Sequence, residues 1–279
     1  MLHPKITTIS RLLSALLLAS LLITGIAQAE MSEAESMERG LAIAKEADRR
    51  DTGFTDFTAS MVMELRNKHG DVSKRTIRLK TLEVIGDGDK SMSIFDSPAD
   101  VKGTAFLTYS HAIKPDEQWL YLPALKRIKR INSKNKSGPF MGSEFAYEDL
   151  SSQEVEKYTY KYLRDEKLKT KEFPEGIDTF VIERYPAYEH SGYTRQVVWV
   201  NKGRYVAEKI EFYDRKNSLL KTLTNSGYQQ YLGQYWRPAE MLMENHQTGK
   251  STLLTWENYR FKTGLTDKDF SRNSLKRAR

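Results

Sequence analysis

Apolar and polar residues alternate along most of the chain after about residue 50, with the period of a β-strand. In TDFTASMVMELRN one face carries Phe57, Ala59, Met61, Met63 and Leu65, because successive strand side chains point to opposite faces of a sheet. The break NKHGD leads into SKRTIRLKTLEVIG, where Ile77 and Leu79 alternate with charged residues. These two runs predict a β-hairpin.

Similar short runs follow to the end of the chain: KSMSIFD, TAFLTYS, EQWLYLP, EKYTYKYL, DTFVIERY, TRQVVWVN, YVAEKIEFYD, LLKTLTNSGY, WRPAEMLMEN and KSTLLTWENYRF. Turn residues separate most of them, and no long helical pattern lies between them. Because parallel strands need long crossover connections, this spacing predicts an antiparallel sheet. A sheet of roughly ten strands normally curls, splits or closes into a barrel.

One segment before the first strand has the helical period instead. Ser32 and Glu35 have capping-box spacing. Apolar residues then recur at helical intervals, at Met37, Leu41, Ala44 and Ala47. The pattern predicts an amphipathic helix over about 32–50, and the fold class is therefore mainly β (α+β), with a large curved antiparallel sheet whose concave side is covered by this helix and short ones.

A curved sheet of this kind has either a filled core or an underfilled one that holds a ligand. Several methionines are candidates for its inner face, namely Met61, Met63, Met92, Met241 and Met243. Methionine is flexible and suits a pocket for chains of variable shape, but it also fills ordinary cores. The pattern alone leaves both interpretations open.

Residues 1–29 have the layout of a secretory signal peptide. Lys5 and Arg11 precede an apolar block over 12–26, and AQA follows at 27–29. The apolar block is short for a membrane span, which needs about 20 residues. We therefore expect a cleavable signal over 1–29 and a single exported domain over 30–279.

Composition restricts the chemistry further. The chain has no cysteine, which excludes a disulfide framework and a thiolate metal site. Its 44 basic and 37 acidic residues give a net charge of +7, a mild excess for a nucleic-acid-binding protein. The histidines are scattered, and no nucleophile elbow or phosphate-binding glycine loop is present. We expect no enzyme activity, no metal and no cofactor.

The stretch GPFMGSEFAYEDL combines large apolar residues with carboxylates. Glu144, Glu148 and Asp149 would suit general acid and base catalysis, or they would suit the first turn of a short helix that begins near Ser143. In the second interpretation the acids face water. The apolar residues would then form a lid over the mouth of the sheet: Phe140, Met141, Phe145 and Tyr147.

A basic run precedes that stretch and contains Lys126, Arg127, Lys129, Arg130, Lys134 and Lys136. The residues between them are aliphatic, whereas nucleic-acid binding would favour aromatic platforms. We expect a solvated hairpin. Its charges suit contact with anionic lipid headgroups or an acidic partner protein.

Three consecutive motifs carry a family resemblance: SPADVKGTAFLTY, DEQWLYLPALKRIKRI and SGPFMGSEFAYEDLS. They resemble the periplasmic LolA-like outer-membrane lipoprotein-sorting proteins, in their broader branch and not the true lipoprotein carrier. The later YWRPAEMLMEN and TLLTWENYRF fit the same pattern, so the resemblance runs from about Glu33 to Leu275.

The resemblance implies an incomplete β-barrel plugged by helices, located in the periplasm. It also implies a carrier that moves a lipid or acylated cargo between inner and outer membrane in a hydrophobic cavity, without covalent chemistry. The implied partners are this cargo, an inner-membrane RND-type exporter and an outer-membrane acceptor, with transient membrane contact and no nucleic acid.

Face assignments give the candidate lining of that cavity: Phe57, Met61, Met63, Leu65, Ile77, Leu79, Trp119, Tyr121, Trp199, Ile210, Phe212, Met241 and Met243. The assignment for each strand depends on which alternate residues point inward, since a slip of one residue exchanges the two faces. Two other functions remain open on the sequence. One is an adaptor that docks on an exporter through the basic hairpin, and the other is an envelope hydrolase.

Overall fold

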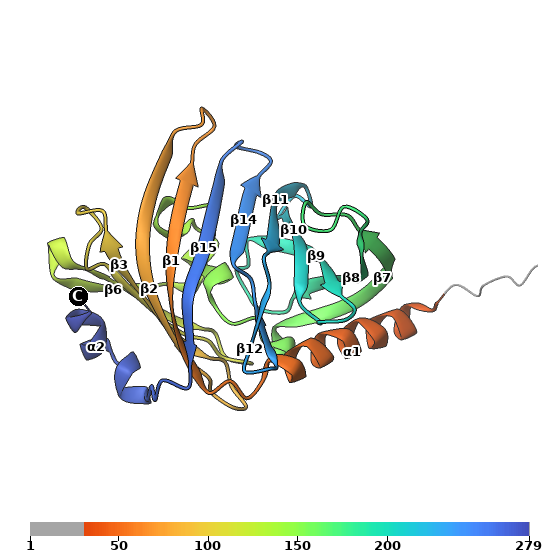
Figure 1. Cartoon of the computed structure of the whole chain (residues 1–279), viewed down its shortest axis with the longest axis horizontal. Coiled ribbons are helices and arrows are strands. Elements are labelled where there is room, and N and C mark those ends of the chain that lie inside the picture. The colour runs from red at the N-terminus through yellow and green to blue at the C-terminus, as the bar shows by residue number, and fades with distance from the viewer. Residues whose placement is uncertain (1–30, 279) are drawn as a thin grey trace, which may run out of the picture. The chain divides into compact units, whose positions relative to one another are not determined.

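Thirteen antiparallel strands form one sheet, in the order β6-β5-β4-β3-β2-β1-β15-β14-β11-β10-β9-β8-β7 (Figure 1). The computed structural model describes residues 31–278, so the predicted signal peptide over 1–29 lies outside the described residues. Contacts divide the chain into Met1–Met31 and Ser32–Arg279, and all the described helices and strands belong to the second unit.

The strands of the main sheet are β1 (Asp56–Arg66), β2 (Val72–Leu82), β3 (Lys90–Ser97), β4 (Ala105–Tyr109), β5 (Glu117–Leu122), β6 (Arg127–Ile131), β7 (Tyr158–Leu168), β8 (Ile177–Pro186), β9 (Tyr193–Asn201), β10 (Ala207–Asp214), β11 (Leu219–Ser226), β14 (Glu240–Asn245) and β15 (Ser251–Phe261). A separate two-stranded hairpin consists of β12 (Gln229–Tyr231) and β13 (Tyr235–Arg237). The α-helices are α1 (Glu33–Asp51) and α2 (Arg272–Arg277). Short 3₁₀ helices are η1 (Pro123–Leu125), η2 (Ser133–Asn135), η3 (Phe140–Gly142), η4 (Tyr147–Leu150), η5 (Val155–Lys157) and η6 (Asp267–Phe270).

The chain enters the sheet at its centre and leaves it there. It meanders from β1 to the edge strand β6, crosses the sheet through η2–η5 to the opposite edge strand β7, and meanders back to β15, which pairs with β1. The predicted first hairpin is confirmed, with Met61 opposite Ile77 in the pairing of β1 with β2. The sequence pattern underestimated the strand number because β12 is only three residues long and β6 reads as part of a charged hairpin.

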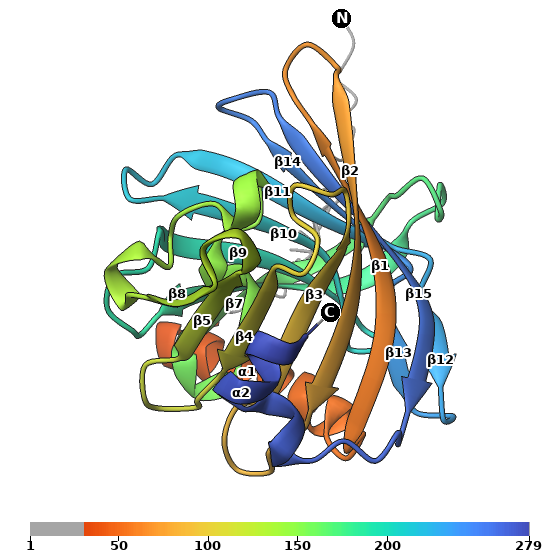
Figure 2. The ribbon, with the colours of Figure 1, turned by 90° about the vertical axis from the view of Figure 1, so that its left-hand side faces the viewer.

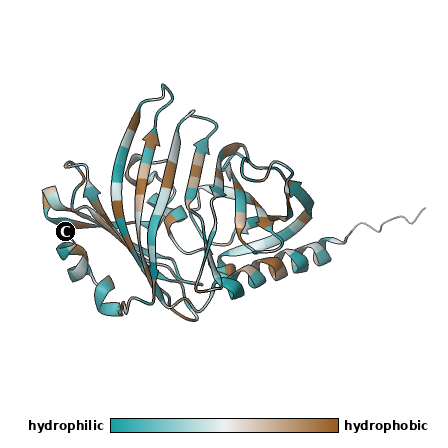
Figure 3. Cartoon of the chain, viewed as in Figure 1, coloured by the Kyte–Doolittle hydropathy of each residue, from teal (hydrophilic) through white to brown (hydrophobic). Residues whose placement is uncertain are grey.

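The sheet is strongly curved but is not closed into a barrel. Residues from every one of its thirteen strands belong to one apolar cluster, so both edge strands face the same interior. Apolar positions alternate with polar ones along the central strands, which places one face of each strand in this cluster (Figure 3). Ile43 of α1 and Phe140 and Phe145 of the crossing segment complete the cluster from the concave side.

The outer face of β3, β4 and β5 is also buried. Phe270, Leu275 and Ala278 of the C-terminal segment pack there against residues such as Leu107 and Trp119. Figure 2 shows α2 lying across β4 on this side of the sheet. These strands are therefore largely buried on both faces, unlike the central ones.

Helix α1 confirms the predicted amphipathic helix and its start. Ser32 Oγ accepts the Glu35 N–H at 3.3 Å, and the Glu35 carboxylate accepts the Ser32 N–H at 2.9 Å. The helix packs on β7 through Ser36, Gly40 and Ile43. A Cβ at Gly40 would lie 2.8 Å from backbone atoms of Lys161 and Tyr162, so only glycine allows this approach.

Replacing Gly40 by alanine tests this contact. In an exposed helix interior the change would stabilise by about 0.5–1 kcal/mol, but here we expect a loss of roughly 1–3 kcal/mol because the methyl group overlaps the β7 backbone. Urea unfolding measures the change, with Glu38→Ala on the exposed side of α1 as the control. A stabilised Gly40→Ala variant would contradict close packing of α1 on β7.

Candidate functional site

A cavity of about 770 Å³ lies between the concave face of the sheet, α1 and the segment that crosses from β6 to β7. This volume falls within the range of about 300–1,000 Å³ that is typical of ligand pockets. The lining from the strands is mainly apolar and includes Met61, Met63, Phe106, Ile182, Val198, Val200 and Leu254. Ala44 and Ala47 of α1 face the cavity from the opposite side.

Five residues of the predicted lining lie on the cavity wall: Phe57, Met61, Met63, Leu79 and Met241. Five others point to the same concave interior but are covered by their neighbours, namely Leu65, Ile77, Ile210, Phe212 and Met243. Their role in ligand binding therefore stays a prediction, and a change at these positions would act through packing.

The predicted placement of Trp119, Tyr121 and Trp199 in the cavity lining is wrong. Trp119 and Tyr121 lie on the outer face with the C-terminal segment, as does Met92. Trp199 packs on the outer face of β9 and donates its indole N–H to Glu166 Oε1 at 2.9 Å. Both faces of β5 and β9 carry buried large apolar residues, so period-2 alternation could not identify the inner face.

The stretch 138–150 extends over the concave face. Phe140 and Phe145 are 1% and 2% exposed and both line the cavity. Phe140 packs edge-on against Tyr147, with ring centroids 5.5 Å apart, while Met141 is half-buried beside the same cluster. The predicted helix start at Ser143 is wrong: η4 begins after Ala146, whose N–H donates to Asp149 Oδ2 at 2.7 Å.

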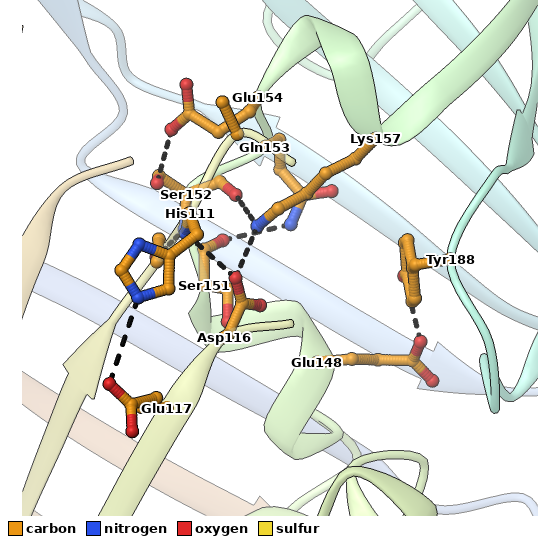
Figure 4. Close-up of polar contacts among 12 residues, drawn as sticks. His111, Asp116, Glu117, Glu148, Ser151, Ser152, Gln153, Glu154, Lys157 and Tyr188 are labelled. Atoms are coloured by element: carbon orange, nitrogen blue, oxygen red, sulfur yellow. Dashed lines mark hydrogen bonds and ion pairs between the residues drawn. The ribbon is translucent and has the colours of Figure 1, made fainter. Parts of the chain in front are cut away.

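The carboxylates of this stretch do not face water as expected. Glu148 is 5% exposed and accepts hydrogen bonds from the Tyr188 hydroxyl at 3.0 Å, Ser191 Oγ at 2.9 Å and the Gly192 N–H at 2.8 Å (Figure 4). Burial raises the pKa of Glu148, and the neighbouring charge of Asp149 adds to the rise. Its three donors fix the crossing segment to the loop between β8 and β9.

Asp149 forms a second buried anchor with Lys221 of β11. Lys221 Nζ lies 2.7 Å from Asp149 Oδ2 and also donates to the Glu144 carbonyl at 2.8 Å. The Tyr193 hydroxyl donates to Asp149 Oδ1 at 2.8 Å, and Asn245 donates to Glu144 Oε2 at 2.7 Å. The carboxylates of Glu144, Glu148 and Asp149 thus all accept hydrogen bonds from distant parts of the chain and anchor the segment to the sheet.

A third anchor holds the two ends of the crossing segment to the loop before β5. Asp116 Oδ1 lies 2.9 Å from Lys157 Nζ (Figure 4). Asp116 Oδ2 lies 3.6 Å from Lys136 Nζ. Burial favours a higher pKa for Asp116, but Lys157 and Lys136 outweigh it and lower the pKa. Lys136 is therefore buried in an ion pair, and its predicted place on a solvated hairpin is wrong.

The rest of the basic run does form an exposed hairpin. Lys126, Arg127, Lys129 and Arg130 lie exposed at the turn before β6 or along this edge strand. Arg130 pairs with Glu117 at 3.1 Å. Lys126, Arg127 and Lys129 are exposed at the β6 edge of the sheet, the edge opposite to β7.

The mouth of the cavity carries charged residues that the alternating pattern did not single out. Acidic side chains lie on one side, namely Asp48, Glu83, Asp89, Glu154 and Glu156, and Arg204 and Arg237 lie elsewhere on the lining. Burial raises the pKa of Asp89 to about 7, opposed by the Val84 N–H and reinforced by Glu154. These residues come from α1, η5, β13 and several loops, which only the folded chain brings together.

Two classes of site are absent from the described part of the chain. Residues 31–278 contain no group of three or more histidine, aspartate or glutamate side chains placed to hold a metal ion. No helix within the same range has the length and hydropathy needed to cross a membrane.

The Lys221–Asp149 pair gives a stability prediction. Lys221→Met keeps most of the side-chain volume but leaves the Asp149 carboxylate buried without its cation, and we expect a loss of about 3–5 kcal/mol. Lys74→Met removes an exposed pair with Glu64 and should cost less than about 1 kcal/mol. Urea unfolding of both variants compares the pairs, and equal small losses would show that the crossing segment is not anchored by Lys221.

Asp89 gives a pH-dependent prediction. The unfolded chain loses this proton near pH 4, whereas the folded protein keeps it to about pH 7. The folded state therefore binds more protons in this window, and stability falls as the pH rises through it. Asp89→Asn should remove this fall and be more stable than the parent at pH 8, by roughly 1–2 kcal/mol after solvent screening.

Urea unfolding at pH 5 and pH 8 measures that difference, with Asp100→Asn at an exposed position as the control. The same pH dependence in the parent and in Asp89→Asn would rule out the raised pKa.

Comparisons with known proteins agree with this architecture. A family model of uncharacterized proteins matches residues 87–277, and no curated protein matches the sequence. A domain from Vibrio parahaemolyticus, assigned as an outer membrane lipoprotein-sorting protein, is 58% identical with a TM-score of 0.83, and the match covers 86% of this chain and 99% of that one.

Two further solved structures extend the likeness. A DUF1329 family protein from Desulfovibrio piger is 30% identical with a TM-score of 0.79, over 86% of this chain and 99% of that one. A LolA superfamily protein from Nitrosomonas europaea shares the fold at 20% identity and a TM-score of 0.67, over 84% of this chain and 98% of that one. The resemblance of the three central motifs is thereby confirmed: the chain has the LolA-like fold and belongs to the same family as the Vibrio outer membrane lipoprotein-sorting domain and the DUF1329 protein.

Proposed function

We propose that this protein is a periplasmic carrier that binds a lipid or acylated (lipoprotein) cargo in its cavity and moves it between the inner and outer membrane. The observation that carries the proposal is the 770 Å³ cavity with an apolar wall, in a fold shared with a lipoprotein-sorting domain. The carboxylates that the sequence suggested for catalysis, Glu148 and Asp149, are engaged as anchors.

Acyl-chain burial supplies the driving force. Each CH₂ removed from water contributes about 0.8 kcal/mol, so a chain of a dozen carbons outweighs the cost of ordering and association. The flexible side chains of Met61, Met63 and Met241 can adapt to chains of different shape. The bound state therefore needs no covalent bond between protein and cargo.

Entry to the cavity would involve α1 more readily than the 138–150 stretch. That stretch is held by two buried ion pairs and by the hydrogen bonds to Glu148, and lifting it would break all of these contacts. The C-terminal half of α1 meets the cavity mainly with small or polar side chains, such as Ala44, Ala47 and Asp48. Phe140 and Phe145 then form the fixed floor of the cavity, and the aromatic residues that the sequence predicted as a lid belong to the core.

The partners follow from the same proposal. An RND-type inner-membrane exporter would supply the cargo and an outer-membrane acceptor would receive it. The exposed basic edge of Lys126, Arg127, Lys129 and Arg130 suits brief contact with anionic headgroups or an acidic partner surface.

A filled cavity tests the function. Ala44→Trp places a large ring in the cavity, whereas Ala42→Trp places the same ring on the exposed side of α1. Lipid extraction and mass spectrometry of the purified proteins should find acylated molecules with the parent and with Ala42→Trp. We expect Ala44→Trp to retain several-fold less, because the ring occupies the volume that the acyl chain needs.

Equal lipid content in the two tryptophan variants would place the lipid outside the cavity. A parent protein without any bound or bindable acyl chain would contradict the carrier function itself and favour an adaptor role.

A further inference from the structure

One end of the cavity wall is polar. It is built by the turn between β9 and β10, the end of β11 and the β12–β13 hairpin, and its residues include Arg204, Asn225, Tyr228 and Trp236. Apolar residues such as Phe106, Ile182 and Val198 form other parts of the wall. A ligand that fills the whole cavity would therefore meet two chemically different surfaces.

Arg204 is a half-buried cation with unused hydrogen-bonding capacity. Its guanidinium carbon lies 5.6 Å from the ring centres of Phe173 and Tyr228 and 5.1 Å from that of Trp236, and the side chain is 20% exposed. Within residues 31–278 its guanidinium N–H groups find no hydrogen-bond acceptor, although the group has five donors. A donor group held in this way gains strongly from an acceptor placed in the cavity.

Glu208 does not satisfy Arg204. Its Oε1 lies 3.9 Å from the guanidinium, beyond hydrogen-bonding distance, and accepts the Asn201 amide at 2.8 Å instead. Burial raises the pKa of Glu208, against the lowering effects of Asn201 and Arg204. The nearest carboxylate is thus directed to another partner.

The side-chain oxygen of Asn225 is a buried hydrogen-bond acceptor that no donor of the described structure reaches. The residue is 8% exposed, and its Nδ2 donates to the Ala207 carbonyl at 2.7 Å, which the Tyr228 hydroxyl also contacts at 2.6 Å. Its buried Oδ1 has no hydrogen-bond partner in the described structure. Such an oxygen is costly to bury unless a hydroxyl or N–H group reaches it.

Arg237 reinforces the positive character of this end. It also lines the cavity, is 13% exposed, and pairs at 2.5 Å with Asp51, which lines the cavity too. Arg204 lies 5.6 Å from the Tyr228 ring centre, and Arg237 lines the same cavity. The polar end thus offers guanidinium donors and one free amide oxygen next to an apolar chamber.

We propose that the cavity selects amphiphiles with an anionic headgroup, in which Arg204 donates to a carboxylate or phosphate and Asn225 Oδ1 accepts from an adjacent hydroxyl or N–H. The acyl chain would extend toward Phe106 and Val198. This inference rests on the proposed function, since it requires that an amphiphile enters the cavity at all. The inference specifies the class of headgroup that the site prefers and the residues that recognise it.

Displacement of a fluorescent fatty acid tests the headgroup site. The competitors are hexadecanoate, its uncharged methyl ester, 1-hexadecanoyl lysophosphatidate and inorganic phosphate. The parent should bind the two anionic lipids roughly tenfold or more tighter than the ester. This is the gain in affinity that one charge-assisted hydrogen bond provides. The tighter of the two anions identifies carboxylate or phosphate as the preferred group.

Arg204→Gln should abolish that preference and leave the affinity for the ester unchanged, which also shows that the variant is folded. Arg195→Gln is the matched control, because Arg195 has similar exposure and stacks on Tyr213 but lies away from the cavity lining. Asn225→Asp, which adds a negative charge beside Arg204, should weaken both anionic lipids and spare the ester.

Two results would overturn the headgroup site while leaving the carrier function intact: equal affinity of the parent for ester and anions, or an anion preference that survives Arg204→Gln. Displacement by inorganic phosphate as strong as by lysophosphatidate would also overturn it, since the site would then bind a free ion. If no lipid displaces the probe from the parent, the proposed function fails together with the inference.

Discussion

The edge strands of this sheet do not pair to close a barrel, so another part of the chain must cover the apolar concave face. The rest of the structure depends on the segment that crosses this face. Here the chain fills the sheet from its centre to one edge, crosses the concave face once, and returns from the other edge to the centre. The crossing segment brings backbone groups and several charges into the interior. Its buried partners, Lys221 for Asp149 and three donors for Glu148, make that burial tolerable.

The same solution explains why a cavity exists. The crossing segment covers β1 to β6 with Phe140 and Phe145, and α1 packs on β7 through Gly40, but neither element fills the space between them. Anchoring by buried ion pairs is strongly directional, so the segment cannot simply collapse into that space. The result is a rigid floor, an apolar chamber and a polar end around Arg204, an arrangement suited to a molecule that is itself part apolar and part charged.

Local patterns were sufficient where one face of an element is buried and the other is wet. The period of Met61 and Met63, the capping box at Ser32 and the first hairpin were all predicted correctly. They failed where both faces are buried, as at Trp119 and Trp199, because alternation no longer distinguishes the faces. They failed again for Glu148 and Asp149, since a carboxylate that follows a loop looks solvent-exposed until its distant partners are known.

The sequence by itself determined the type of fold, the helix that covers it and, through three long motifs, the family. These features depend on neighbours within a few residues or on unusual stretches of chain. Only the tertiary structure decided which apolar residues face the cavity, because that depends on whether the C-terminal segment covers the other side of the sheet. It also decided the polar end, because Arg204, Asn225 and Trp236 come from separate turns and strands and meet only when the sheet curves around them.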